Sequence, residues 1–578
     1  MNGKLEFKCH VADVVVVGGA GAGCRAAIAA AEEGVDVILL DKGVIGRSGA
    51  TPCALWSIQA PFGERGMDPR DSPDQMFRDM VVAGRYLGDQ NIVEVITQTA
   101  CDRILDLERY GVKFKKTPEG RFYQTPMPGQ TYPRSCFMIE NGHSLSTILA
   151  KEVSRHRNIW PRNDFMSYGV ITKGRRAVGI LGLDLQTGCL EAVLGKSTVL
   201  ASGGYTSIWE FSDNPPTMTG DAVAMAYRAG ADIVDLEFNQ FYGTDVIWPP
   251  SVKGTVVLYE LLAEPFTDAN VYNNKGEPVF PKPLPIRDEA IRIMYKEIRE
   301  GRGTPHGGLW YDVTKSPKGK EEVRRIFEEM TPKHYRFLIE AGGIDLVDEP
   351  LEVAPASHYQ CGGVYINEKG ETTVAGLYAC GECSGNYQGA NRLAGSALAD
   401  TQTMGAQAGK HAAQAAKAGK TPKPTLTQTN VQKILKRATL FTKAKKGGVK
   451  AQAVKDRIKK LVGEYVAPIR DEKGLRRALT GLKAVEAKML KRINVPDLGN
   501  YNLEWCEALE ADLMLDTATL TVLSCLFRKE SRGHHFRLDY PDQDDRNWLK
   551  HTVIRMRNGK PYITTKPVKY TKMPPGRG

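Results

Sequence analysis

The sequence predicts an α/β protein in which a Rossmann-like domain starts near the N-terminus, is interrupted by a second domain and is completed later in the chain. A strand, a glycine-rich turn, a helix and a second strand follow one another within the first 41 residues. Glycine-rich strand–turn–helix character returns over residues 351–409. Because apolar strands on both sides of a helix are typical of a parallel sheet, we expect both stretches to belong to one sheet.

The N-terminal unit has the clearest pattern. Residues 13–17 are a β-branched run that predicts a buried strand. Residues 25–33 are rich in alanine and predict a helix, which Gly34 ends. Residues 35–40 predict a second apolar strand that stops at Asp41. This order is a βαβ unit.

The rest of the chain alternates between helical, hairpin and irregular stretches. We expect helices over residues 72–110 with a break near 87–88, and a hairpin of residues 178–185 and 190–200. A proline-rich irregular stretch over 249–285 is followed by a predicted helix over 286–300. A linker is expected at 421–424, with helices after it to about residue 529. The predicted domains are the Rossmann-like domain in two parts (1–240 and 351–420), an inserted α+β domain (241–350), a helical domain (425–530) and a short, irregular tail domain (531–578).

Composition excludes several classes of protein. With 42% hydrophobic residues over 578 positions, the chain has enough apolar surface to form a large core, so disorder is excluded as its main state. The sequence has no apolar run of membrane-spanning length, and its first residues do not resemble a secretory signal. Eleven cysteines without a signal indicate reduced thiols. We therefore expect a cytoplasmic protein, which could associate with a membrane only through partner subunits.

The net charge of +11 is concentrated in one segment. Residues 431–490 hold 17 Lys and Arg against 5 Asp and Glu. A solvated helical face is the ordinary interpretation, and a docking face for an acidic partner or substrate is the alternative. No binding motif or aromatic platform accompanies the charge, so nucleic acid is not an expected partner.

A dinucleotide site is predicted at the turn between the first strand and its helix. The turn reads Gly18-Gly19-Ala20-Gly21-Ala22-Gly23, an imperfect match to the strict glycine spacing. Gly18 permits a tight turn, the small residues let backbone amides approach a pyrophosphate, and Gly23 lets the helix lie close to the strand. Asp41 stands where an acidic group accepts hydrogen bonds from ribose hydroxyls.

Six blocks over most of the chain then follow the motif order of one family. They are residues 71–90, 219–241 (TGDAVAMAYRAGADIVDLEFNQF), 287–303, 354–364, 376–398 (GLYACGECSGNYQGANRLAGSAL) and 530–552. In these blocks the chain resembles the fumarate reductase / succinate dehydrogenase flavoprotein family, which includes L-aspartate oxidase and, more distantly, adenylylsulfate reductase. The resemblance implies FAD, an FAD-binding domain interrupted by a capping domain, and a C-terminal helical domain.

The resemblance also implies where the cofactor is held. Glu382 resembles the second flavin-ribose contact, Ser396 and Leu398 the flavin-contacting end of a family motif, and Asp221 the aspartate of another. The complete set of expected cofactor residues is Gly18, Gly21, Gly23, Asp41, Lys42, Ser48, Ala50, Thr51, Gly203, Asp221, Glu382, Ser396 and Leu398. The family's covalent attachment uses a histidine where this chain has Gly49, so we expect non-covalent FAD.

Two matches and two departures mark the expected reaction site. His358 and Arg392 match family substrate ligands, and a guanidinium can grip a carboxylate with two hydrogen bonds. Tyr242 replaces a substrate-binding histidine, and Pro265 or Phe266 replaces the proton-transferring arginine. Tyr242 is therefore a candidate hydrogen-bond or proton donor, and Glu264 is another. Packing or surface roles are equally open for both.

The leading hypothesis is an FAD-dependent oxidoreductase that acts on a CH–CH or C=C bond of a small carboxylate-type substrate other than plain fumarate or succinate. We expect it to be one member of a complex that exchanges electrons with an iron–sulfur subunit. The alternatives are a soluble enzyme of the aspartate oxidase or adenylylsulfate reductase type, and an electron-relay flavoprotein without substrate chemistry. Cys380 and Cys383 have the spacing of a redox dithiol, but they lie inside a block that the resemblance assigns to flavin binding, so we do not expect a dithiol role. No metal is expected, because the adjacent pair His534/His535 lacks the partners of a metal site.

Overall fold

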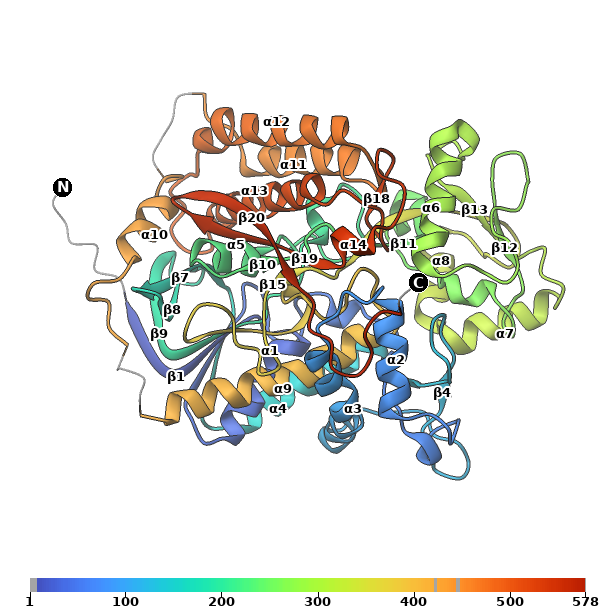
Figure 1. The fold of residues 1–578 in the computed structure, drawn as a ribbon, viewed down its shortest axis with the longest axis horizontal. Coiled ribbons are helices and arrows are strands. Elements are labelled where there is room, and N and C mark those ends of the chain that lie inside the picture. The colour runs from blue at the N-terminus through green and yellow to red at the C-terminus, as the bar shows by residue number, and fades with distance from the viewer. Residues whose placement is uncertain (1–7, 420–423, 443–446, 577–578) are drawn as a thin grey trace.

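A mixed sheet of seven strands is the largest sheet of the described structure. The computed structural model describes residues 8–419, 424–442 and 447–576. The strands are β1 (Cys9–Val17), β2 (Val37–Leu40), β6 (Ile159–Arg162), β7 (Phe165–Lys173), β8 (Arg176–Asp184), β9 (Cys189–Leu200) and β16 (Leu377–Ala379). Of these, β1, β7, β8 and β9 are labelled on the left in Figure 1. Their order is β6-β2-β1-β9-β8-β7, and β16 also pairs with β9. The pairs β6–β2, β2–β1, β1–β9 and β9–β16 are parallel, whereas β8 is antiparallel to both its neighbours.

Two alanine- and glycine-rich helices pack against this sheet and against each other. They are α1 (Gly21–Glu32) and α9 (Ser396–Lys417), which lie side by side and are labelled to the right of β1 in Figure 1. A Cβ atom on Gly409 would lie 2.1 Å from the Ala26 carbonyl oxygen, so the helices approach at backbone distance. Because β16 and α9 come from the part of the chain after residue 350, the Rossmann-like fold is completed late in the sequence, and the predicted fold class is confirmed.

A second, antiparallel sheet lies to one side of the first. Its order is β11-β14-β13-β12, formed by β11 (Asn239–Trp248), β14 (Leu351–Gln360), β13 (Leu309–Asp312) and β12 (Asn270–Tyr272). Helices α6 (Arg287–Glu297), α7 (Lys320–Met330) and α8 (Pro332–Gly342) surround it, and together they enclose a hydrophobic core of their own. The long strands β11 and β14 bring chain segments more than 100 residues apart into register.

The C-terminal part consists mainly of helices. They are α10 (Val431–Ala438), α11 (Ala451–Tyr465), α12 (Glu472–Lys488) and α13 (Leu503–Phe527), followed by α14 (Asp545–Trp548) and the antiparallel pair β19 (Lys550–Arg557) and β20 (Lys560–Pro567). Helix α13 is the longest and is buried nearly all round, because it lies between α11, α12 and the Rossmann-like domain. The expected linker at 421–424 falls mostly outside the described residues.

The remaining elements include the helices expected over 72–110 and the short strands around them. They are α2 (Pro73–Ala83), α3 (Gln90–Tyr110), α4 (Asn141–Arg155), α5 (Asp221–Arg228), β3 (Ser57–Gln59), β4 (Gln124–Thr125), β5 (Ser135–Phe137), β10 (Ile233–Val234), β15 (Gly363–Val364), β17 (Ile469–Arg470) and β18 (Phe536–Arg537). The first helix of the βαβ unit starts four residues earlier than the alanine pattern predicted, because its first turn uses the glycines Gly21 and Gly23.

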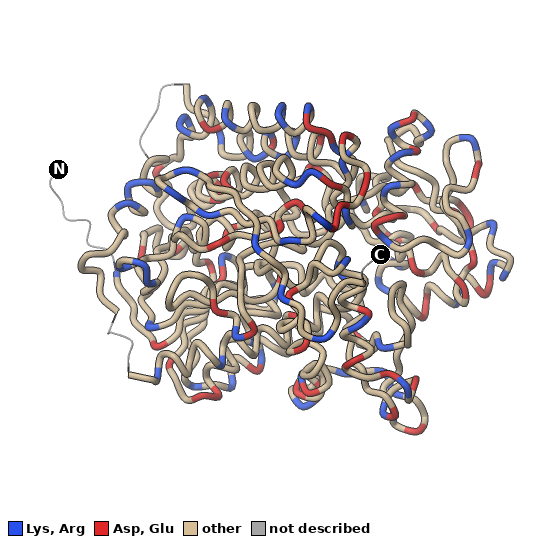
Figure 2. The backbone as a smooth tube through the Cα atoms, in the orientation of Figure 1, with Lys and Arg blue, Asp and Glu red and all other residues tan. Residues whose placement is uncertain are grey.

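The basic segment lies mainly on α11 and α12, where Figure 2 shows Lys and Arg along the edge of the molecule. On α12 the cations Lys473, Arg476, Arg477 and Lys483 are exposed, as a solvated helical face requires. Lys455 on α11 differs from them, since it is buried and turned toward the rest of the protein. None of the helices in the described part of the chain has the length and apolar character needed to cross a membrane.

Candidate active site

The backbone packs so closely around the turn after β1 that Gly18 and Gly23 have no room for a side chain. Gly18 has φ of +109°, and a Cβ atom there would lie 2.3 Å from the Ala201 carbonyl oxygen. A Cβ atom on Gly23 would lie 1.7 Å from the Gly18 carbonyl oxygen, so only glycine lets α1 start this close to β1. Gly21 donates its amide hydrogen to Thr51 Oγ1 at 3.1 Å. The turn therefore presents the N-terminus of α1 to a cavity, as a pyrophosphate site requires.

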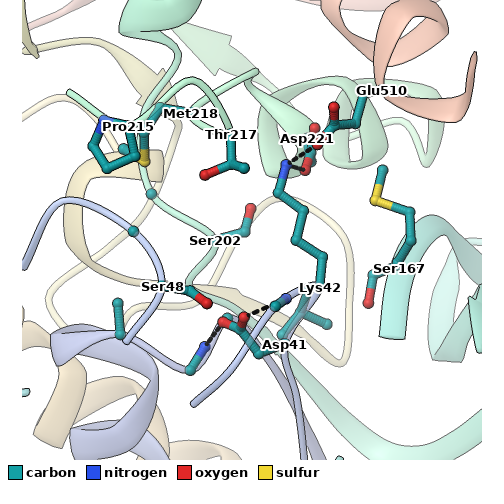
Figure 3. A pocket seen from close by; sticks show the side chains of 18 of the residues that line it. Asp41, Lys42, Ser48, Ser167, Ser202, Pro215, Thr217, Met218, Asp221 and Glu510 are labelled. Atoms are coloured by element: carbon teal, nitrogen blue, oxygen red, sulfur yellow. Dashed lines mark hydrogen bonds and ion pairs between the residues drawn. The ribbon is translucent and has the colours of Figure 1, made fainter. Parts of the chain in front are cut away.

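Asp41 ends β2 beside this turn. Its Oδ2 accepts a hydrogen bond from the Gly19 amide at 2.6 Å, and its Oδ1 accepts one from the Gly43 amide at 2.8 Å. Each carboxylate oxygen keeps a second lone pair, so the group can still accept hydrogen bonds from ribose hydroxyls. Figure 3 shows Asp41 on the wall of the cavity, next to Lys42.

Lys42 is held between two carboxylates from different domains. Its Nζ lies 2.8 Å from Asp221 Oδ2, at the start of α5, and 2.7 Å from Glu510 Oε1, on α13 (Figure 3). Burial alone would lower the pKa of Lys42, but the two carboxylates raise it above its ordinary value. Lys42 is therefore a permanent cation at this point of the cavity.

A cavity of about 660 Å³, called the larger cavity below, runs from the glycine turn past Asp41 and Lys42. Nine of the thirteen predicted cofactor residues line it: Gly18, Asp41, Lys42, Ser48, Ala50, Thr51, Gly203, Asp221 and Glu382. Ser167 also faces it, with a buried hydroxyl that has no hydrogen-bond partner among the described residues. An elongated cavity with a glycine cradle, a ribose acceptor and an unused hydroxyl fits a dinucleotide the size of FAD.

The other four predicted cofactor residues do not line the larger cavity. Gly21 and Gly23 shape the turn from behind, as described above. Leu398 lines the smaller cavity described next. Ser396 is fully buried, and its hydroxyl lies 2.9 Å from Leu393 O and 3.0 Å from Gln388 Oε1, so its single hydrogen is donated to one of these two acceptors within the protein.

Glu382 lies where the larger cavity meets a second one. Burial raises its pKa to about 8, although the hydrogen bond that it accepts from the Gln360 amide at 3.1 Å opposes this. The carboxyl group is therefore largely protonated at neutral pH and can donate as well as accept a hydrogen bond. Such a group suits a hydroxyl-bearing ligand, and the contact of Glu382 with a flavin ribose stays a prediction.

The second cavity, called the smaller cavity, has a volume of about 190 Å³. It shares Ala50, Thr51, Cys53, Glu382 and Thr401 with the larger cavity, so the two adjoin. All three predicted catalytic residues, Tyr242, His358 and Arg392, line it. Leu55, Trp56, Met127, Val256, Leu258 and Ala394 make much of the remaining wall apolar.

Arg392 is a buried cation without a carboxylate partner among the residues that the structure describes. Only 5% of its surface is exposed, and its guanidinium donates to Gln240 Oε1 at 3.0 Å and to the Leu393 carbonyl oxygen at 3.2 Å. The group lies over the Tyr359 ring at 4.6 Å. Burial and the neighbouring Arg287 lower the pKa of Arg392. A buried charge is costly unless it is paired, so Arg392 is prepared for an anion.

Arg287 is a second buried guanidinium in the same wall, and the sequence analysis did not assign it a role. Its Nε donates to Glu260 Oε1 at 3.1 Å and its Nη2 donates to the same oxygen, while Nη1 is buried without a partner in the described part of the chain. Although burial opposes the effect, Arg287 lowers the pKa of Glu260. The pair is therefore neutral overall, and it leaves one N–H edge of Arg287 available.

Tyr242 supports this pair instead of presenting a free hydroxyl. Its hydroxyl donates to Glu260 Oε2 at 2.5 Å and accepts from the Tyr259 amide at 2.9 Å. Burial and then Glu260 raise the pKa of Tyr242 well above its ordinary value. Direct proton donation by Tyr242 would have to break the bond to Glu260.

His358 is oriented by an acidic side chain. Its Nδ1 lies 2.5 Å from Oδ2 of Asp213, which is almost fully buried. The peptide carbonyl of His358 accepts from the Asn214 side chain at 2.7 Å, so the same loop holds both its backbone and its ring. A carboxylate on one ring nitrogen fixes the orientation of an imidazole.

Some candidates from the sequence lie elsewhere. Glu264, considered as a proton donor, is 61% exposed at its side chain and pairs with Lys318, so that prediction is wrong in this structure. Pro265 and Phe266 do not line the smaller cavity. Cys380 and Cys383 are buried free thiols within the core. His534 Nε2 lies 3.0 Å from Asn391 Oδ1, away from any group of metal-ligating side chains in the described ranges.

The fold and these two cavities define a flavoprotein of the Rossmann type in which a smaller cavity with a buried arginine adjoins the larger one. A family model described as FAD binding domain matches residues 13–398, and one described as fumarate reductase flavoprotein C-term matches residues 455–577. The chain belongs to the fumarate reductase / succinate dehydrogenase flavoprotein family and is an FAD-binding oxidoreductase.

Similar proteins cover nearly the whole chain. A fumarate reductase (CoM/CoB) subunit from Methanothermobacter marburgensis is 35% identical over 546 residues, which span 93% of this chain and 96% of the relative. The succinate dehydrogenase flavoprotein subunit of Rickettsia bellii is 31% identical and covers 98% and 96%. A solved variant of the E. coli quinol fumarate reductase superposes with a TM-score of 0.89 at 25% identity, covering 99% of both chains.

Three residues of the site were not predicted from the sequence: Arg287, Glu260 and Asp213. Arg287 opens the block of residues 287–303 that carried part of the family resemblance, so a signal was present. No local pattern marks Glu260 or Asp213, because each reaches the site through a partner 27 or 145 residues away along the chain.

Proposed function

We propose that the protein is an FAD-dependent oxidoreductase acting on a CH–CH or C=C bond next to a carboxylate, as the flavoprotein component of a complex that exchanges electrons with an iron–sulfur subunit. The observation that carries this proposal is Arg392, a buried guanidinium without a carboxylate partner in the described structure, in a cavity that adjoins the FAD cavity. A substrate carboxylate supplies the missing negative charge.

The residues of the smaller cavity divide the remaining tasks. FAD, when bound, gives or takes a hydride at one carbon of the substrate bond. Arg392 binds the carboxylate and polarises the adjacent bond. His358, oriented by Asp213, is placed to exchange the proton at the other carbon. Arg287 supplies a second hydrogen-bond edge, and Tyr242 and Glu260 position it.

The balance of charge favours a substrate with one carboxylate. Glu260 already neutralises Arg287, so Arg392 is the cation left for the substrate. Leu55, Trp56, Met127 and Leu258 offer an apolar surface to the rest of the molecule. A 2-enoate with an alkyl or aryl substituent matches both the single cation and the apolar wall. Fumarate would instead place its second carboxylate against the ion pair of Arg287 and Glu260, which is neutral overall.

Fumarate reduction is the second candidate. It is favoured by the 35% identical relative whose name is that of a fumarate reductase, and Nη1 of Arg287 could still receive a second carboxylate. Two relatives are named as subunits of larger enzymes, which supports an electron-transfer partner for this chain. An electron relay without substrate chemistry is disfavoured, because nothing then explains the unpaired Arg392.

Anaerobic reoxidation tests the proposal. The bound flavin is reduced photochemically, and fumarate, an alkyl or aryl 2-enoate, an enoyl-CoA or adenylylsulfate is added while the visible flavin absorbance is followed. Rapid recovery with 2-enoates supports the proposal, and recovery with fumarate alone supports the second candidate. The proposed reaction is contradicted if the absorbance recovers only with adenylylsulfate, or if none of the added acceptors restores it. Copurification with an iron–sulfur protein at native expression tests the proposed partner separately.

A further inference from the structure

The C-terminal helical domain contributes a wall to the larger cavity. Leu503, Cys506, Glu507 and Glu510 line it from α13, at the three- and four-residue spacing that places side chains on one helix face. Gln452 and Lys455 line it from α11. All six residues lie beyond residue 398, where the match to the FAD-binding family model ends.

This wall belongs to the adenosine end of the cavity. In a Rossmann-type site the pyrophosphate lies at the N-terminus of the first helix and the acidic residue after the second strand binds the adenosine ribose. Asp41 is that acidic residue, and Nζ of the next residue, Lys42, is 2.7 Å from Glu510 on α13 (Figure 3). The opposite end, at Thr51 and Glu382, opens into the smaller cavity, where the substrate is expected.

We propose that α11 and α13 complete the adenosine subsite of FAD and that Leu503 packs against the adenine ring. Leu503 is 60% exposed although it lines a cavity, so a bound ring would cover apolar surface that now meets solvent. Phe165, Met166 and Leu185 from the Rossmann-like domain line the same cavity and are buried, so among these four apolar side chains Leu503 is the one with exposed surface for the adenine to cover.

A chain of charges fixes the helical wall in place. Glu510 Oε1 is 2.7 Å from Lys42 Nζ and Glu510 Oε2 is 2.8 Å from Lys455 Nζ, while Asp221 holds Lys42 from the other side at 2.8 Å. Glu510 therefore links the residue next to the ribose acceptor with both helices. The buried position of Lys455, unlike the exposed cations of α12, follows from this role.

Ligands that contain or lack the adenosine part test the proposal. Full-length flavin-free protein, expressed under riboflavin limitation, is titrated with FAD, with ADP and with FMN, and binding is followed by tryptophan fluorescence and by thermal shift. We expect Leu503→Ser to weaken FAD and ADP binding about tenfold and to change FMN binding less than twofold. Leu503→Met, which keeps the apolar contact, should bind all three ligands like the wild type.

Leu498→Ser is the matched control, because Leu498 is 59% exposed close by in the sequence and does not line the cavity. Equal losses in the two serine variants, an unchanged FAD affinity in Leu503→Ser, or an equal loss for FMN would each overturn the proposal. If Leu503→Ser fails to fold, the same titrations are made with Leu503→Ala and Leu503→Gln. The quantity compared with the wild type is then the ratio of the affinity for ADP to the affinity for FMN. This ratio is independent of which substrate the smaller cavity accepts.

Discussion

Arg287 donates through its Nε to Glu260 at 3.1 Å, so one of the two guanidinium groups facing the smaller cavity is neutralised within the protein. Arg392, in the same wall, has no such carboxylate in the described structure. This difference between two buried arginines determines how much negative charge a substrate can bring.

Replacing Glu260 should change the preference for ligand charge. In Glu260→Gln the cation of Arg287 is released, so we expect succinate to bind about tenfold more tightly relative to a saturated monocarboxylate such as 3-phenylpropanoate. Perturbation of the flavin absorbance gives both dissociation constants. Glu264→Gln is the control, because that carboxylate is exposed and pairs with Lys318. An unchanged ratio of the two constants in Glu260→Gln would show that Glu260 does not set the charge preference.

Replacing Tyr242 distinguishes two possible roles of its hydroxyl, which are to position Glu260 or to donate a proton to the substrate. Tyr242→Phe removes the hydrogen bond to Glu260, so we expect a stability loss of about 1–2 kcal/mol and a fall in turnover of about tenfold or less, with the FAD content unchanged. Tyr259→Phe, whose hydroxyl bonds the Pro285 carbonyl, is the control for losing a tyrosine hydroxyl in this region. A loss of turnover above a thousandfold would instead indicate that Tyr242 supplies the proton itself.

Glu382 should make the stability of the flavin-free protein depend on pH. Its pKa of about 8 in the folded state exceeds the ordinary value of 4.5, so the folded protein retains a proton that the unfolded chain releases. That contribution is complete below about pH 4.5 and is lost as the pH rises through about 8. The thermal midpoint of Glu382→Gln should therefore rise relative to the wild type between about pH 5 and pH 8, and then level off. Parallel pH curves for the two proteins would refute the raised pKa.

The flavin should be released by acid. Gly49 occupies the position of the family's attachment histidine, and its backbone lines the larger cavity with φ of +76°. Because glycine has no nucleophilic side chain, we expect all yellow colour to enter the supernatant after acid precipitation of the purified protein. Colour that stays with the pellet would mean that another side chain forms a bond to FAD.

Local pattern was sufficient to predict the central fold. The β-branched run, the glycine turn and the alanine-rich helix predicted β1 and α1, because buried parallel strands and tight helix packing restrict which residues fit. The predicted hairpin corresponds to β8 and β9, and the break in the helices over 72–110 separates α2 from α3. The family blocks then located the residues that meet at the two cavities.

Contacts between distant segments could not be predicted in this way. Glu260 lies within the irregular, proline-rich stretch of residues 249–285, and its role depends on how α6 places Arg287 against it. Lys455 stands in a basic run whose pattern indicates a solvated face, yet the packing of α11 on α13 turns it toward Glu510. These relationships depend on tertiary packing, which neither spacing nor composition records.

The role of Arg392 as the receptor for the substrate carboxylate is tested most directly by the anaerobic reoxidation rate of reduced Arg392→Gln with a 2-enoate, at FAD content equal to that of the wild type. We predict a rate at least about a hundredfold below the wild type, an intermediate rate for Arg392→Lys, and an unchanged rate for the exposed control Arg70→Gln. A wild-type rate in Arg392→Gln would contradict the proposed substrate site.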